Sequence, residues 1–353
     1  MPMTTADTTT TYQHYTKESF SSSRFTDLIE PHVTLALQQF KSITRNYALF
    51  HISFFFLGCL ELLAFVLFFS FLTKTTILAF SLAGIFLTGF SYFLLLFYFQ
   101  AKKPEQLLAL KHTFLEQTQA ILPFQKKTQQ FHQCTIRALE CLIDRLHAQE
   151  YTYYAAFQSF QTLGPLMKKF SVWCHWKDVH QMKELLFQLV IKEAIELIKM
   201  APTDLEPHAA LATAYWALAN HYLDPRKTDP ETEHLFVSLE YDSAEMNEKF
   251  KKNASRAIEE FKILAEYAPK DPWVHAQLAA IYHALNQPEE EIQQMQIIRT
   301  LQPKEKEVLF RLGVLYFSQG KHAEALCLYE ELQQIHANKA LELLSYYDAY
   351  ALD

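Results

Sequence analysis

Two long apolar runs constrain this chain more than any other feature. Residues 47–72 read YALFHISFFFLGCLELLAFVLFFSFL with one acid and one histidine, and residues 77–99 read ILAFSLAGIFLTGFSYFLLLFYF with no charge. As helices they would be roughly 39 and 35 Å long, enough to cross a hydrocarbon core of ~30 Å. Neither run has the polar stripe that a surface helix of a soluble protein shows. The sequence therefore predicts two transmembrane helices.

The short connection between the runs predicts a tight antiparallel hairpin over residues 47–100. Only residues 73–76 separate the two helices, and they contain a single basic residue, Lys74. Lysine and arginine are more frequent beside the outer ends of the hairpin, at Lys41, Arg45, Lys102, Lys103 and Lys111. Because cytoplasmic flanks carry the excess of positive charge, we expect both termini to face the cytoplasm, most simply from a bacterial inner membrane.

One acidic residue, Glu61, falls in the middle of the first run. Counting back from the turn, positions whose numbers sum to about 149 face each other, which places Thr88 opposite Glu61. A carboxylate in a bilayer costs a few kcal/mol unless it is neutralised or paired. Two helices cannot enclose an ion pathway, so we expect Glu61 and Thr88 to form a polar contact within the membrane that holds the hairpin or an oligomer together.

The segments beside the hairpin are predicted from their composition. Residues 1–24 are rich in serine and threonine and read as disordered. Residues 25–46 have apolar side chains at helical spacing, typical of an amphipathic helix that lies on a membrane or packs on a soluble domain. Residues 101–180 read as a helical connecting region. Cys174, His175 and His180 occur there, but a zinc site needs three or four convergent ligands, and we expect no metal.

The C-terminal half contains an internal repeat. APTDLEPHAALATAYWAL at 201–218 matches APKDPWVHAQLAAIYHAL at 268–285, and QPKEKEVLFRLGVLYFSQG at 302–320 follows the second copy by 34 residues. A 34-residue period of paired helices resembles the tetratricopeptide repeat (TPR). The resemblance implies an all-α superhelix over residues 181–353, with an insertion at about 220–252 inside the first copy. A closing helix at 338–350 would cap its exposed apolar face.

The same resemblance assigns packing roles. Small residues stand where two helices cross closely, and large apolar residues fill the spaces beside them. In the middle copy Glu291 replaces the small residue of the second helix. The predicted packing residues are Leu211, Tyr215, Ala257, Phe261, Leu278, Tyr282, Leu312, Gly313, Tyr316 and Ala325.

The first helix of each TPR lines a concave surface that binds a partner. The residues that this places on the surface are mostly apolar and aromatic, which suits an amphipathic helix or a hydrophobic peptide. Alternatively, the insertion or residues 105–180 cover them. The predicted partner-binding residues are Thr213, Trp216, Trp273, His283, Phe310, Val314 and Phe317.

Composition argues against several functional classes. The chain has only six glycines and no glycine-rich phosphate loop, and we find no known catalytic motif, so we expect no catalytic residues and no cofactor. Residues 201–353 carry a net charge of −11, which argues against nucleic acid as a partner.

These features favour a scaffold that is anchored in the bilayer by the hairpin and binds a protein or peptide through its TPR-like domain. The alternative is a secreted effector, because a two-lobed hydrophobic segment after a Ser/Thr-rich N-terminus resembles bacterial inclusion-membrane proteins. In that case the partner would be a host protein. A third hypothesis is an enzyme with an unrecognised site in residues 105–180.

Overall fold

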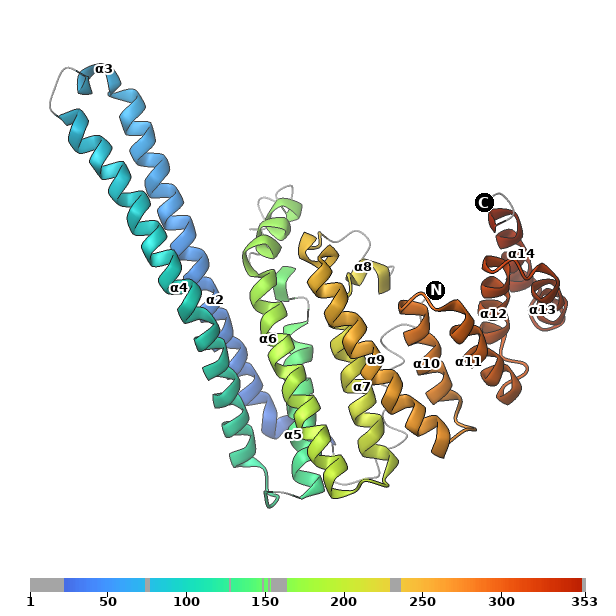
Figure 1. Ribbon diagram of the computed structural model, residues 1–353. Coiled ribbons are helices and arrows are strands. Elements are labelled where there is room, and N and C mark those ends of the chain that lie inside the picture. Colours follow the sequence, from blue (N-terminus) through green and yellow to red (C-terminus); the bar gives the residue numbers. More distant parts are fainter. Residues whose placement is uncertain are drawn as a thin grey trace. The chain divides into compact units, whose positions relative to one another are not determined.

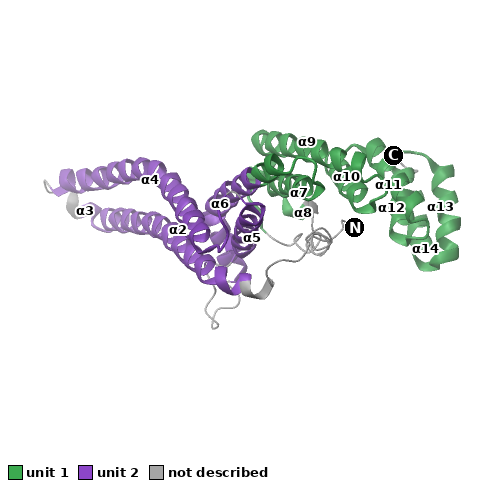
Figure 2. Cartoon of the chain, turned by 90° about the horizontal axis from the view of Figure 1, so that it is seen from below, with its two compact units in different colours: residues 1–18, 194–353 green, residues 19–193 purple. Residues whose placement is uncertain are grey.

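The computed structural model describes residues 22–73, 77–126, 128–147, 149–151, 153, 164–228 and 236–350. Within these ranges every regular element is a helix, which confirms the predicted all-α fold. Lys74 and residues 1–21 of the predicted disordered segment lie outside the described residues. Residues 22–24 of that segment belong to the first helix. The chain divides into two compact units, residues 19–193 and residues 1–18 with 194–353, coloured separately in Figure 2.

Unit 2, residues 19–193, is built around two very long antiparallel helices. Helix α2 (Ser22–Leu67) and helix α4 (Ile77–Ile121) pack along each other, with the short α3 (Phe69–Leu72) at their far end (Figure 1). The first apolar run is therefore interrupted at Phe68, where the predicted helix over 47–72 breaks. Conversely, the predicted amphipathic helix at 25–46 is not a separate element, because α2 continues through it into the apolar run without a break.

The halves of α2 and α4 away from α3 pack against α5 (Gln129–Leu146), and an ion pair links α4 to α6 (Gly164–Met200), whose last residues belong to unit 1. The short η2 (Gln149–Tyr151) contacts α6, because the Glu150 carbonyl accepts a hydrogen bond from Ser171. Phe25, Ile29, Val33 and Phe40 of α2 are buried. The sequence left open whether the amphipathic part of α2 lies on a membrane or packs on other helices of the chain. The structure shows the second arrangement.

Unit 1 is a succession of antiparallel helix pairs, α7 with α9, α10 with α11 and α12 with α13. Helix α14 packs on both α12 and α13 and closes the series. The short α8 and η5 lie between α7 and α9 in sequence. The bounds are α7 (Leu205–His221), α8 (Pro225–Thr228), η5 (Leu239–Asp242), α9 (Ala244–Tyr267), α10 (Pro272–Ala284), α11 (Pro288–Leu301), α12 (Lys306–Ser318), α13 (His322–Ile335) and α14 (Ala337–Tyr350).

The 34-residue period is visible in the backbone itself. Asn286 and Gly320 have φ of 56° and 69°, the left-handed conformation that lets a helix end and the chain turn back. The residue after each donates its amide to a carbonyl five residues earlier, Gln287 N to Tyr282 O and Lys321 N to Tyr316 O, both at 2.9 Å. The two pairs thus end their first helices in the same way.

A histidine ties successive helices together in two of the copies. His208 Nδ1 lies 2.8 Å from Glu260 Oε2 and its Nε2 lies 3.2 Å from Pro202 O. Sixty-seven residues later, His275 Nδ1 lies 2.8 Å from Gln294 Oε1 and its Nε2 lies 3.1 Å from the carbonyl of the equivalent proline, Pro269. Paired helices with this spacing and these turns form a TPR-type α–α superhelix, as the sequence predicts.

Candidate functional site

The predicted partner-binding residues lie on α7, α10 and α12, the first helices of the three pairs, and are here called the first-helix face. They differ widely in exposure. His283 is exposed, Trp216 retains 9 % of its accessible surface and Phe317 only 1 %. The other members, Thr213, Trp273, Phe310 and Val314, are half-buried.

Helix α14 covers the part of the first-helix face that lies on α12. The ring of Phe317 packs edge-on against Tyr347, with centroids 5.7 Å apart, and Phe310 packs on Tyr346. Between these two rings a Cβ on Gly313 would come within 2.6 Å of Leu343 Cδ2. Phe317 therefore differs from the expectation of an open groove position, because the closing helix, rather than the insertion, occupies that surface.

The predicted packing residues lie where two helices meet. Tyr215 is half-buried, with the guanidinium of Arg256 5.6 Å from its ring centroid. The hydroxyl of Tyr316 accepts a hydrogen bond from Gln296 Nε2 at 2.7 Å. The members that are buried are Leu211, Ala257, Phe261, Leu278, Tyr282, Leu312, Gly313, Tyr316 and Ala325.

A buried carboxylate connects α10, α11 and α12. Glu291 is 1 % exposed, and its Oε2 accepts from His283 Nδ1 at 2.9 Å while Oε1 accepts from Arg311 at 2.7 and 3.0 Å. Burial raises the pKa of Glu291, but the hydrogen bonds from His283 and Arg311 and their charge outweigh it and hold the pKa below its ordinary value. The carboxylate thus replaces the usual small residue by binding two first helices at once.

Within the hairpin, the structure pairs the two residues that the sequence places opposite each other. Thr88 Oγ1 donates to Glu61 Oε1 at 2.8 Å, while Glu61 Oε2 is buried with no hydrogen-bond partner among the described residues. Nearer the base of the hairpin, His51 Nδ1 lies 3.2 Å from the hydroxyl of Tyr92. These contacts hold α2 and α4 in one register.

At the base of the hairpin, polar side chains from several elements form a layer that sequence reasoning missed. Lys103 Nζ lies 2.5 Å from Oδ1 of the buried Asp178, which ties α4 to α6. Thr44 Oγ1 donates to the Tyr153 hydroxyl at 3.0 Å, and the ring of Tyr153 stacks on the buried ring of His175 with centroids 3.9 Å apart. Lys103 entered the sequence argument only as a topology signal, because its partner lies 75 positions away.

Burial shifts the titration of this polar layer. The pKa of His175 falls to about 4, chiefly through burial and secondarily through the charge of Lys103, so the ring is neutral at pH 7. Burial raises the pKa of Asp178, and the attraction of Lys103 opposes that shift. The pKa of the Cys174 thiol is raised to about 11, mainly through burial, so the thiol stays protonated.

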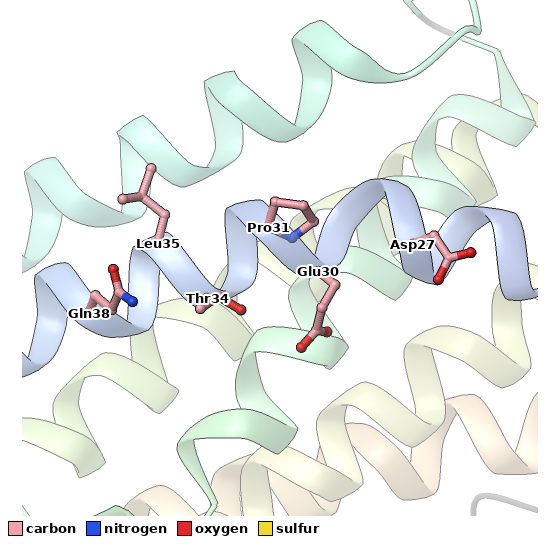
Figure 3. Close-up of a pocket in the computed structure, with 6 residues that line it drawn as sticks. All are labelled: Asp27, Glu30, Pro31, Thr34, Leu35 and Gln38. Atoms are coloured by element: carbon pink, nitrogen blue, oxygen red, sulfur yellow. The ribbon is translucent and has the colours of Figure 1, made fainter.

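A shallow hollow with polar lining lies on α2. Figure 3 shows that its side chains all come from one helix and do not converge on a common point. Glu30 forms an ion pair with Arg145 of α5. The lining residues are Asp27, Glu30, Pro31, Thr34, Leu35 and Gln38. A one-helix surface of this kind is the solvated face of an amphipathic helix.

Among the described residues no group of three or more histidine, cysteine, aspartate or glutamate side chains is placed to hold a metal ion. Cys174, His175 and His180 share α6, but the two histidine rings stack on different aromatic partners, Tyr153 and Trp176. The buried carboxylates of Glu291 and Asp178 instead form ion pairs between helices.

No family model and no curated protein matches the chain. Solved structures that align with it include a thermophilic TPR protein of Thermus thermophilus, at 16 % identity over 63 % of this chain and 92 % of that chain with a TM-score of 0.30. MamA AMB-1 aligns at 15 % identity over 56 % and 95 %, with a TM-score of 0.29.

A third structure, Naa15/Naa10 bound to HypK-THB, aligns at 15 % identity over 91 % of this chain and 44 % of that chain, with a TM-score of 0.23. These similarities are low. The helix pairs are instead recognised in the chain itself, by the 34-residue period, the two left-handed turns and the two equivalent histidines.

Proposed function

We propose that this protein is a membrane-anchored scaffold that binds a protein partner through its TPR-type unit. The observation that carries the proposal is the combination of two features in one chain. Helices α2 and α4 are each long and apolar enough to cross a membrane, and no described part of the chain buries their apolar segments. The same chain carries a series of helix pairs, an architecture whose concave surface binds other proteins.

The exposure of the apolar helices supports the membrane part of the proposal. Phe55, Phe80 and Phe86 retain 74 %, 78 % and 81 % of their accessible surface. Soluble proteins rarely expose contiguous apolar surface on this scale, whereas a bilayer removes it from water at ~25 cal/mol per Å². The polar layer of Lys103 and Asp178 lies just beyond the end of the second apolar run, where a spanning helix meets water.

Helix α14 covers the part of the first-helix face on α12, and this limits where a partner could bind. Because α14 packs on Phe310 and Phe317, the surface we propose lies on α7 and α10 and includes Thr213, Trp273 and His283. The half-buried Trp273 ring packs on Phe261 at 5.7 Å between centroids, which holds it in a fixed orientation. A rigid aromatic side chain beside an exposed imidazole suits an amphipathic or hydrophobic segment of a partner.

The proposed scaffold acts by binding and has no catalytic step. Its hairpin places both termini in the cytoplasm, and the inner membrane of a bacterium is the membrane we propose. Anchoring raises the effective concentration of a bound partner at the membrane surface.

Cysteine accessibility tests the anchor. Single cysteines at Lys74 and at Thr203, in a background without native cysteines, should react with a membrane-impermeant reagent from opposite sides of the membrane. If both cysteines were labelled equally from the same side of the membrane, the hairpin topology would be refuted. If the protein were recovered in the soluble fraction without disruption of the membrane, with both cysteines labelled, the anchor would be refuted.

Partner capture tests the binding surface. Trp273→Ala in the full chain should reduce copurification of partner proteins, whereas Glu290→Ala, an exposed change on the neighbouring α11, should not. Hydrogen exchange in α10 should be compared in both variants, because the tryptophan also packs on Phe261. Undiminished capture by folded Trp273→Ala would place the binding surface elsewhere.

A further inference from the structure

The first three turns of α6 expose an unusual set of side chains. Trp173 retains 77 % of its accessible surface and Leu166 retains 63 %, the two most exposed large apolar residues described between α4 and α7. They are seven residues apart and so share one face of the helix. Lys177, four residues after Trp173, is exposed on the same face. Exposed tryptophan and leucine flanked by lysine are typical of a helix at a membrane interface.

The contacts of α6 show which way this end points. Asp178 pairs with Lys103 of α4, and further along α6 Glu193 Oε2 lies 2.5 Å from His132 Nδ1 near the start of α5. Since α5 follows the end of α4, α6 runs in the same direction as the lower part of α4. Its residues before Asp178 therefore extend toward the apolar half of the hairpin, as Figure 1 shows.

Helix geometry then gives the height of the exposed residues. At 1.5 Å per residue, Phe99, the last residue of the second apolar run, lies ~6 Å along α4 from Lys103. By the same rise Trp173 lies ~7 Å, and Leu166 ~18 Å, from Asp178 toward the hairpin tip. Trp173 is thus level with the end of the apolar run, and Leu166 reaches past it.

We propose that the start of α6, residues 164–177, is a membrane-interface contact on the side where both ends of the hairpin lie. Trp173 and Leu166 contact lipid chains near the headgroups, and Lys177 binds the phosphates of anionic lipids. The inference rests on the proposed spanning hairpin and adds a third contact with the same bilayer. Two features argue for lipid as the occupant: the patch is level with the lipid-facing surface of α4, and its positive charge complements anionic headgroups.

Site-specific photocrosslinking in the full chain, reconstituted in nanodiscs with clickable lipids, tests this inference. Benzoylphenylalanine replaces Trp173, Phe86 of the hairpin or Gln188 of α6 in separate variants. Gln188 is exposed and lies ~22 Å further along the same helix than Trp173. We expect lipid adducts at Phe86 and Trp173 and none at Gln188.

The outcomes separate the two proposals. Adducts at Phe86 without adducts at Trp173 would overturn the interface contact and leave the anchor intact. No adduct at Phe86 would overturn the anchor itself. A protein adduct at Trp173 in place of lipid would overturn the interface contact by showing that another occupant covers this face.

A second set of variants tests whether the positive charge of the patch contributes to lipid binding. Lys177→Gln should lower the Trp173 lipid yield roughly fivefold in phosphatidylglycerol-containing nanodiscs, as expected for ~1 kcal/mol per lysine. In pure phosphatidylcholine it should have little effect. Lys192→Gln, an exposed lysine beyond the patch, is the matched control. Equal yields in both variants and both lipids would overturn the role of Lys177.

Discussion

The burial of Phe317 makes a sharp test of how unit 1 is closed. Phe317, at the partner-binding position of α12, is 1 % exposed because Tyr347 of α14 packs on its ring. Truncating a fully buried phenylalanine to alanine removes its transfer free energy and leaves a cavity, together about 3–5 kcal/mol. Because the lost contact is with α14, this loss should appear first as opening of that helix.

The assay is hydrogen exchange of the full chain, read by mass spectrometry at peptides from α14. Phe317→Ala should speed exchange there by about 100-fold or more, since about 1.4 kcal/mol corresponds to a factor of ten. Tyr267→Ala is the matched aromatic control, because Tyr267 is 68 % exposed, and an exposed truncation changes stability by less than ~0.5 kcal/mol. If Phe317→Ala left α14 protected but abolished partner capture, Phe317 would be an open binding residue and the reasoning from burial would be refuted.

Three further predictions concern charged and polar side chains. Glu291→Ala leaves Arg311 without its carboxylate and should destabilise the α10–α13 region by about 3–5 kcal/mol, measured by thermal melting or hydrogen exchange. The control Glu290→Ala should cause no measurable change. Equal melting temperatures for the two variants would show that the buried ion pair does not contribute to stability. His175 has a pKa of about 4 in the folded chain, below the ordinary value of 6.5, so its contribution to stability is fully present above pH 6.5 and is lost progressively as the pH falls from 6.5 to about 4. This loss amounts to about 3 kcal/mol, and His175→Phe, which keeps the stacking on Tyr153, should flatten that part of a stability–pH profile; an unchanged profile would contradict the assignment. Glu61→Gln should leave insertion and thermal stability of the hairpin nearly unchanged, because an amide oxygen also accepts from Thr88, and loss of function in a folded, abundant variant would instead indicate an ionic role.

Sequence reasoning worked where a contact follows from local periodicity. The positions of the two apolar runs, the 34-residue period and the pairing of Thr88 with Glu61 all follow from counting along the chain. Counting works there because a short turn or a fixed period leaves one register.

It failed where the environment of a residue depends on a distant segment. Trp216, His283 and Phe317 occupy the same repeat position, yet His283 is exposed, Trp216 retains 9 % of its accessible surface, and Phe317, which lies under α14, retains only 1 %. The repeat identifies the position, but the neighbouring helix decides whether it is open. In the same way, Lys103 and Asp178 show no sequence signal as a pair.

The unbroken course of α2 and α4 has a mechanical consequence. At 1.5 Å per residue, the 46 residues of α2 measure about 69 Å, more than twice the ~30 Å of a hydrocarbon core, so in the proposed anchor α2 would continue well beyond the bilayer into the rest of unit 2. A hairpin responds to a thinner bilayer by tilting. Because α2 runs without a break from its apolar part into the part that packs on α5, that tilt would turn the base of the hairpin together with α5. Bilayer thickness would thereby set the angle at which unit 2 leaves the membrane.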